Sequence, residues 1–343
     1  MRAALLPTTG DPFIMAYWLR NFATWRDEVD ELIVLANAYT FRDMPFVRRQ
    51  VEVAGGRLLV TPGPLGHGEA IRRLLQTTSA DHVVLCEEDA FVRRPRAVSA
   101  SFAAIEDNDT DVIGSPRGEE HVRVEWGGYD PTDTAEVAHN LWPAFLFARA
   151  ADLRATSQQF GDRQWALGQM VEGLGPVTPE HCTLVGVAPD RIHLDTFAGT
   201  TFELRAAGLL VELVHHTRLY DLAASWKALA DDPPPWFHVT GSSEMPHVLN
   251  GTRPEALPDY GQGGGQWVRR LAWWERIVNA VDAPGKAEYL DMLARFRLYA
   301  GIDPAEDWAA LFDAYEEHGP YTPTMLKLAR LLDLDRPFVE AEA

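Results

Sequence analysis

Three consecutive carboxylates, Glu87, Glu88 and Asp89, directly follow an apolar run at residues 83–86. The run predicts a short buried strand, and parallel α/β sheets place their sites at the carboxyl ends of strands. Carboxylates about 4 Å apart repel by roughly 4 kcal/mol at an effective dielectric of about 20, unless a cation offsets their charge. Mg²⁺ and Mn²⁺ are commonly held by one or two carboxylates and by phosphate oxygens of a substrate. The cluster therefore predicts a divalent-metal site that holds a diphosphate, and the alternative is an acidic strand end in solvent.

A second group with metal-binding chemistry is the histidine pair His215 and His216, which ends the apolar run 209–214. Neutral imidazole ligates divalent transition metals, so either histidine could complete a site begun by the acids. His238 competes for the same role. For each of these residues the alternative is a histidine that caps a strand end by a hydrogen bond.

The segments that must position these residues alternate between short apolar runs and stretches with helical spacing. Asp11 followed by Pro12 is typical of a helix N-cap with proline at the first helical position. We expect strands at 3–6, 32–36, 57–61 and 81–86, and helices at 12–25, 41–53 and 67–78. Such alternation indicates βαβ units with right-handed crossovers. The predicted fold is α/β, with a Rossmann-like, mostly parallel sheet flanked by helices.

The second half of the chain is less regular. We expect helices at 96–105 and 164–173, and strands at 111–114, 141–147 and 209–214. The glycine-rich stretch 261–265 predicts a flexible connector. Beyond it, aromatic residues fall on apolar faces of predicted helices, which indicates a C-terminal helical module at 266–343.

The order of elements over residues 3–216, with acids after the fourth strand, resembles the GT-A-fold glycosyltransferases of the family-2-like, nucleotide-sugar-dependent kind. Their Asp-x-Asp signature holds a nucleotide-diphosphate sugar through a metal. The resemblance implies that Asp89 ligates the metal, that Glu87 lies near the ribose or base, and that a late-strand histidine completes the metal site. The chain departs from the family where Glu87 replaces the first aspartate and where residues 70–71 replace an Arg-Asn pair common in that family.

The resemblance also implies a donor site in the loop after the first strand, formed by Pro7, Thr8, Thr9 and Gly10. A glycine-flanked helix start at His67 can approach a phosphate or sugar closely, so we place His67, Glu87 and Glu88 with the donor as well. An N-cap turn at the first loop and a plain loop-to-helix junction at His67 are the alternatives.

A general base for the acceptor hydroxyl is implied at Asp195, which precedes Gly208, a strand and His215 as in family members. A carboxylate within hydrogen-bond reach of a hydroxyl can take its proton as the glycosidic bond forms. The alternative for Asp195 is a turn or N-cap residue. Asp162 and Glu203 are further candidates.

Composition and missing motifs limit the classes of protein. The formal charge of −19 opposes nonspecific binding to nucleic acids or anionic membranes. No apolar run is as long as the roughly 20 residues that are needed to span a bilayer. Two cysteines, Cys86 and Cys182, provide neither a disulfide framework nor a four-cysteine zinc site, so a cytoplasmic location is expected. The Gly-x-Gly-x-x-Gly and Gly-Lys-Ser/Thr motifs are missing, which argues against a dinucleotide-binding Rossmann domain and a P-loop NTPase.

The resemblance implies a metal-dependent glycosyltransferase that moves a hexosyl or related sugar from a donor such as a UDP-sugar. The cofactor is Mn²⁺ or Mg²⁺, and the acceptor is a hydroxyl of a glycan, a protein or a small molecule. A catalytic domain is expected at 1–250, with a nucleotide-sugar half at 1–115 and an acceptor half at 116–250. A nucleotidyltransferase that uses an NTP and a sugar phosphate, a non-catalytic binding module, and a homo-oligomer built on the C-terminal helices remain open.

Overall fold

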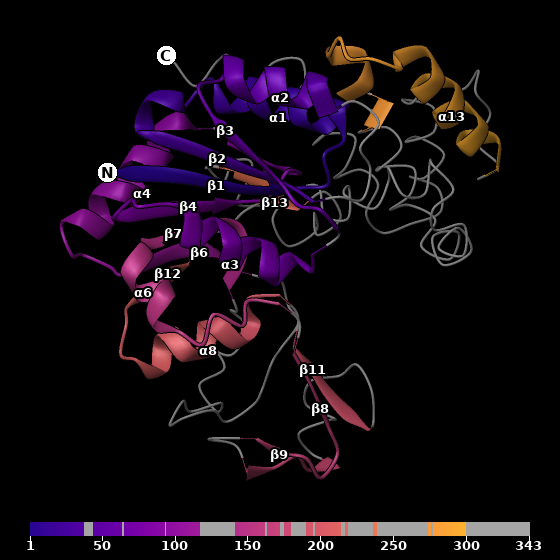
Figure 1. The fold of residues 1–343 in the computed structure, drawn as a ribbon. Coiled ribbons are helices and arrows are strands. Elements are labelled where there is room, and N and C mark those ends of the chain that lie inside the picture. The colour runs from indigo at the N-terminus through magenta and orange to yellow at the C-terminus, as the bar shows by residue number, and fades with distance from the viewer. Residues whose placement is uncertain are drawn as a thin grey trace, which may run out of the picture.

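The computed structural model describes residues 1–37, 44–63, 65–92, 94–116, 141–161, 163–171, 175–179, 190–194, 196–213, 217–218, 236–238, 274–275 and 277–299 (Figure 1). The elements up to the middle of the chain are β1 (Arg2–Thr8), α1 (Pro12–Phe22), a 3-10 helix η1 (Arg26–Glu28), β2 (Glu31–Ala36), α2 (Met44–Val53), β3 (Arg57–Val60), α3 (His67–Thr77), β4 (His82–Cys86), β5 (Ala90–Val92), α4 (Pro95–Glu106) and β6 (Val112–Pro116). Then follow β7 (Leu141–Arg149), α6 (Ala150–Ala155), β8 (Arg163–Ala166), β9 (Met170–Val171), β10 (Gly175–Pro176), β11 (Arg191–Leu194), α8 (Ala198–Ala206), β12 (Val211–Leu213), β13 (Thr217–Arg218), β14 (Trp236–His238) and α13 (Lys286–Tyr299).

A seven-stranded sheet in the order β12-β6-β7-β4-β1-β2-β3 organises the molecule. All its strands run in one direction except β7, which is antiparallel to both of its neighbours. At the centre, Leu5 of β1 lies opposite Ile33 of β2 and Leu85 of β4. The predicted α/β fold with a mostly parallel sheet is therefore confirmed.

Both faces of this sheet are covered, which explains why its strands are apolar at nearly every position. Along β1, Ala4 and Leu6 face a core built with α1, α2 and α4, whereas Ala3 and Leu5 face a second core built with α3, α6 and α8. Figure 1 shows α1 and α2 on one side of the sheet and α3, α6 and α8 on the other.

A small sheet has the strand order β13-β14-β5, and its strand β5 begins directly after Asp89. Trp236 of β14 is buried, donates its indole N–H to Ser115 Oγ, and packs on Phe145 and Phe147 with ring centroids 5.5 Å and 5.7 Å away. The strand that follows the acids is therefore fixed to the main sheet through its partner strand.

The helix predicted at 164–173 is wrong. The structure has β8 there, antiparallel to β11, followed by β9, antiparallel to β10. Gly168 lies between β8 and β9 with φ of +80°, a left-handed conformation that a helix does not use. Leu167 and Met170 are 47% and 72% exposed, so the segment has no apolar helix face to bury.

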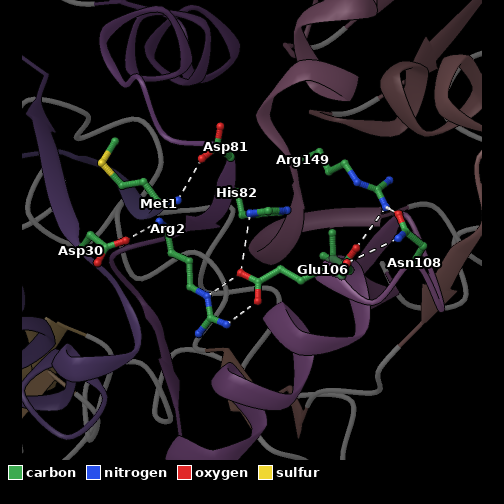
Figure 2. Close-up of polar contacts among 9 residues, drawn as sticks. Met1, Arg2, Asp30, Asp81, His82, Glu106, Asn108 and Arg149 are labelled. Carbon is green, nitrogen blue, oxygen red and sulfur yellow. Dashed lines mark hydrogen bonds and ion pairs between the residues drawn. The ribbon is translucent and has the colours of Figure 1, made fainter.

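The amino edge of the sheet is closed by polar contacts (Figure 2). Arg2 donates from Nε and Nη2 to the two carboxylate oxygens of Glu106 at 2.8 Å and 2.6 Å, and its backbone N–H donates to Asp30 at 2.7 Å. His82 Nδ1 lies 3.7 Å from the same Glu106 carboxylate. These side chains join β1, β4 and α4 at the edge opposite the acids.

Part of the predicted C-terminal module is described. Trp274, Ile277 and Tyr289 are buried in the same core as Phe13 and Trp18 of α1. Residues 266–273 and 300–343 of that module lie outside the described residues, so the proposed division at 250 and 266 stays a prediction. Among the described helices, none combines the length and the apolarity that crossing a bilayer requires.

Candidate functional site

A tight turn carries the three acids from β4 into β5. Ala90 N donates to Glu87 O at 3.1 Å and closes a four-residue turn, while Glu87 N donates to Ala144 O of β7 at 3.1 Å. Glu88 and Asp89 are each only 4% exposed. The acids are therefore held on a rigid, largely buried corner at the carboxyl edge of the sheet.

Glu88 holds the loop that follows β1. Its carboxylate accepts hydrogen bonds from Thr8 Oγ1, from Thr9 N at 3.0 Å and from Thr9 Oγ1 at 2.8 Å. Thr8 Oγ1 in turn accepts from Gly10 N at 2.9 Å, and Gly10 adopts a φ of +82° that glycine tolerates without strain. The structure thus brings together four of the residues that the sequence assigns to the donor, and it uses Glu88 to shape their loop.

Burial raises the pKa of Glu88 to about 8. The hydrogen bonds from Thr8 and Thr9 favour the charged form and oppose this effect, while the charge of neighbouring Asp89 adds to it. Because the folded protein holds this proton more tightly than the unfolded chain, stability should fall as pH rises from the unfolded pKa near 4.5 to about 8, and then level off.

Replacing Glu88 by glutamine should remove this pH dependence, because the amide keeps the shape of the protonated acid and does not ionise. Thermal melts with EDTA at pH 5, 7 and 9 test this. We expect the difference in melting temperature, Glu88→Gln minus wild type, to increase by at least about 3 °C from pH 5 to pH 9. Glu52→Gln on the exposed face of α2 is the control for general charge effects. Parallel curves for Glu88→Gln and wild type would contradict the assignment.

His67 and Glu87 also meet in the structure. His67 begins α3, and its Nε2 lies 3.7 Å from Glu87 Oε1, whose side chain is 13% exposed. The helix start has no side-chain cap, since Gly66 occupies the N-cap position. Its first backbone N–H groups carry the partial positive charge that helix N-termini offer to anions.

Asn37, at the carboxyl end of β2, is a residue that the sequence reasoning missed. Its side chain donates to Leu65 O at 2.5 Å and accepts from Leu65 N at 2.7 Å, and its backbone N–H donates to Thr8 O at 2.8 Å. It therefore joins the loop after β1 to the segment that leads into α3. The available signal was its type: an amide side chain directly after the buried run 32–36.

Asp11 and Tyr289 form a second connection that the sequence did not indicate. Asp11 Oδ1 caps α1 by accepting from Phe13 N at 2.9 Å and Ile14 N at 3.2 Å. Tyr289 of α13 donates its hydroxyl to Asp11 Oδ2 at 2.9 Å. The prediction that Asp11 caps α1 is confirmed. The contact with Tyr289, far away in the sequence, was not predicted.

Several predicted site residues lie outside the described residues: Asp195, His215, His216 and Asp162. The alternative base Glu203 is described and forms an ion pair with Arg163 at 2.8 Å, while its other oxygen accepts from Ser157 N. His238 pairs in register with Ala90, the residue after Asp89. The backbone of His238 therefore lies beside the strand that directly follows the acids.

The chemistry of the acids fits a hard divalent cation. Glu87 and Asp89 flank Glu88 and offer carboxylate oxygens, the ligands that Mg²⁺ and Mn²⁺ prefer. Within the described part of the chain, no group of three or more histidine, cysteine, aspartate or glutamate side chains is close enough together to hold a metal. One or two protein carboxylates are enough to hold such a cation when substrate phosphates supply further oxygens.

Comparison with known proteins found no matching family model and no matching curated protein. Solved structures that resemble the chain include a mannosyltransferase from Pyrobaculum calidifontis in complex with GDP-Man and Mn²⁺, at 13% identity and a TM-score of 0.44, covering 98% of this chain and 87% of that one. TarS from S. aureus has 14% identity and a TM-score of 0.41, covering 97% of this chain and 53% of that one.

A third similar structure is the glucosyl-3-phosphoglycerate synthase of Mycobacterium tuberculosis in complex with Mn²⁺, UDP and glucosyl-3-phosphoglycerate. It has 18% identity and a TM-score of 0.37, and the match covers 67% of this chain and 79% of that one.

Proposed function

We propose that this protein is a metal-dependent glycosyltransferase, which moves a sugar from a nucleotide-diphosphate sugar to an acceptor hydroxyl. The observation that carries the proposal is the contact of Glu88 with Thr8 and Thr9, beside the pair formed by Glu87 and His67. It gathers the loop after β1, the acids after β4 and the start of α3 at one edge of the sheet. A helix N-terminus next to carboxylates that can bind a metal is suited to a nucleoside diphosphate.

In this proposal Asp89 and Glu87 hold Mn²⁺ or Mg²⁺. The metal, when bound, neutralises the negative charge that develops on the departing nucleoside diphosphate. His238 is favoured as a further ligand by its register beside Ala90, and His215 and His216 are the other candidates.

The chain's own groups would bind and orient the donor. The loop of Pro7, Thr8, Thr9 and Gly10 receives the nucleotide, with its shape fixed by Glu88. His67, at the start of α3, offers an imidazole next to Glu87, where it can donate to a phosphate or sugar oxygen.

The proposed acceptor side lies next to the start of α8. This helix leads into β12, which runs parallel to β6, so α8 ends at the amino edge and begins at the carboxyl edge of the sheet. Its N-cap, Phe197, is held by a hydrogen bond from its N–H to Phe160 O at 2.7 Å and stacks on the Phe160 ring at 5.5 Å. Asp195, two residues earlier in sequence, is our proposed general base for the acceptor hydroxyl.

A ligand panel tests the proposal. Thermal stability is measured with Mn²⁺ or Mg²⁺ and UDP-sugars, GDP-sugars or nucleoside triphosphates. Stabilisation by a nucleotide sugar only when metal is present supports the proposal, because a ligand that binds the native state raises its stability. Stabilisation by a triphosphate but by no nucleotide sugar would instead support the nucleotidyltransferase alternative, and no response to any of them would support a non-catalytic module.

Once a donor and an acceptor are identified, Asp195→Asn should lower turnover by a factor of about 10² or more, because a general base acts in the transition state. Donor affinity should change little, since the base adds little to ground-state binding. Steady-state kinetics with calorimetry of the donor separate the two effects. Unchanged turnover together with weaker donor binding would assign Asp195 to the sugar site instead.

A further inference from the structure

The C-terminal segment contacts Asp11, the residue that directly follows the loop assigned to the donor by the proposed function. Tyr289 is 4% exposed, and its ring lies between Phe13, with centroids 4.6 Å apart, and Trp274, with centroids 5.6 Å apart. Its hydroxyl donates to Asp11 Oδ2 at 2.9 Å, across 278 positions of sequence. In Figure 1, α13 lies beside the end of the molecule where β1 leads into α1.

The two carboxylate oxygens of Asp11 make different contacts. Its Oδ1 fixes the first turn of α1, and its Oδ2 accepts from Tyr289, while its backbone follows Gly10 directly. Asp11 is 3% exposed, so a carboxylate oxygen left without its hydroxyl partner would have little water to replace it. The Tyr289 hydroxyl therefore helps to hold Asp11, and with it the end of the loop, together with the cap bonds to α1.

The loop after β1 is thus held at both ends. Glu88 accepts hydrogen bonds from Thr8 and Thr9 at its start, and Tyr289 fixes Asp11 at its finish. Gly10 lies between these two anchors with a left-handed backbone conformation. A loop with a glycine at its centre gains its shape from such anchors, and a preorganised loop binds its ligand with a smaller entropic cost.

We infer that Tyr289 is a positioning residue for donor binding, so that α13 belongs to the donor site and not to the acceptor side alone. The inference rests on the proposed function, because it concerns the same nucleotide loop. It extends the donor site past residue 250, the limit expected from the sequence. Tyr289 acts through Asp11 and needs no contact with the ligand.

Tyr289→Phe tests this inference, because phenylalanine keeps the packing on Phe13 and Trp274 and removes only the hydroxyl. Calorimetry of UDP and of GDP with Mn²⁺, well below the melting temperature, should give a Kd about tenfold higher than that of the wild type. A role confined to stability would lower the melting temperature and leave the Kd unchanged.

Lys286→Met is the matched control. Lys286 Nζ donates to Asn279 O and Val281 O, both at 3.0 Å, so it secures the same segment without touching Asp11. We expect this variant to melt earlier and to bind the nucleotide as the wild type does. An equal rise in Kd for Lys286→Met and Tyr289→Phe would show that loosening of the whole segment is responsible, which overturns the inference.

Asp11→Ser completes the test, because serine can still cap α1 but is too short to reach Tyr289. If the tyrosine acts through Asp11, adding Tyr289→Phe to Asp11→Ser should raise the Kd no further. A Kd for Tyr289→Phe within twofold of the wild type overturns the inference and leaves the proposed function intact. Failure of the wild type to bind either nucleoside diphosphate with Mn²⁺ would overturn both.

Discussion

Sugar transfer by the Asp89→Asn variant is expected to fall by on the order of 10³ relative to wild type. Asparagine keeps the size of aspartate at a position that is 4% exposed, but it removes the charge that the proposed metal site requires. The metal would then no longer offset the charge that develops on the leaving diphosphate. Initial rates at saturating donor, measured over a series of Mn²⁺ concentrations, give the effect.

The fold of this variant should be intact, because asparagine keeps the size of the side chain and removes a negative charge next to Glu87 and Glu88. Asp81→Asn is the matched control: Asp81 precedes the other end of the same strand, with a side chain 73% exposed, at the edge shown in Figure 2. It changes the net charge equally and should keep the wild-type rate. Wild-type turnover by Asp89→Asn at saturating donor would refute the metal assignment.

The parallel core of the fold could be predicted because its local signals agree with one another. Apolar runs buried on both faces become strands, and Asp11 with Pro12 starts α1 as expected. The prediction failed at β8, where apolar residues at helical spacing are exposed and Gly168 turns the chain. A spacing pattern indicates a helix only where a surface exists to bury its apolar face.

The sequence grouped the acids, the loop after β1 and His67 as one candidate site, but it did not show which contact each acid makes. Glu87, Glu88 and Asp89 are similar in sequence, yet the structure gives Glu88 to the loop after β1 and Glu87 to His67. This division depends on how the turn directs each side chain, which composition does not encode. The contact of Tyr289 with Asp11 was equally unreadable, because it depends on the chain returning to its first helix after 278 positions.

The start of α3 is expected to depend on Gly68 having no side chain. A Cβ built on Gly68 would lie 1.9 Å from Gly161 N and 2.4 Å from Gly161 Cα, distances that backbone atoms cannot accommodate without moving. Gly68→Ala should therefore destabilise the protein by about 3 kcal/mol, the upper range for overpacking. Thermal or urea melts should show a clear loss of stability. This sign is informative, because Gly→Ala inside a helix normally stabilises by up to about 1 kcal/mol.

Gly161→Ala is the matched control across the same contact. A Cβ on Gly161 would lie 3.7 Å from the nearest atoms of Gly68, which is ordinary van der Waals contact, so we expect stability close to wild type. If Gly68→Ala has the same melting temperature as the wild type, the close approach of α3 to residues 160–161 is wrong.

The contact also joins the two sides of the proposed site, because Phe160 holds Phe197 at the start of α8 while His67 lies beside Glu87. Gly68→Ala protein that remains folded should therefore bind nucleoside diphosphate more weakly than Gly161→Ala, since displacing α3 separates His67 from the acids.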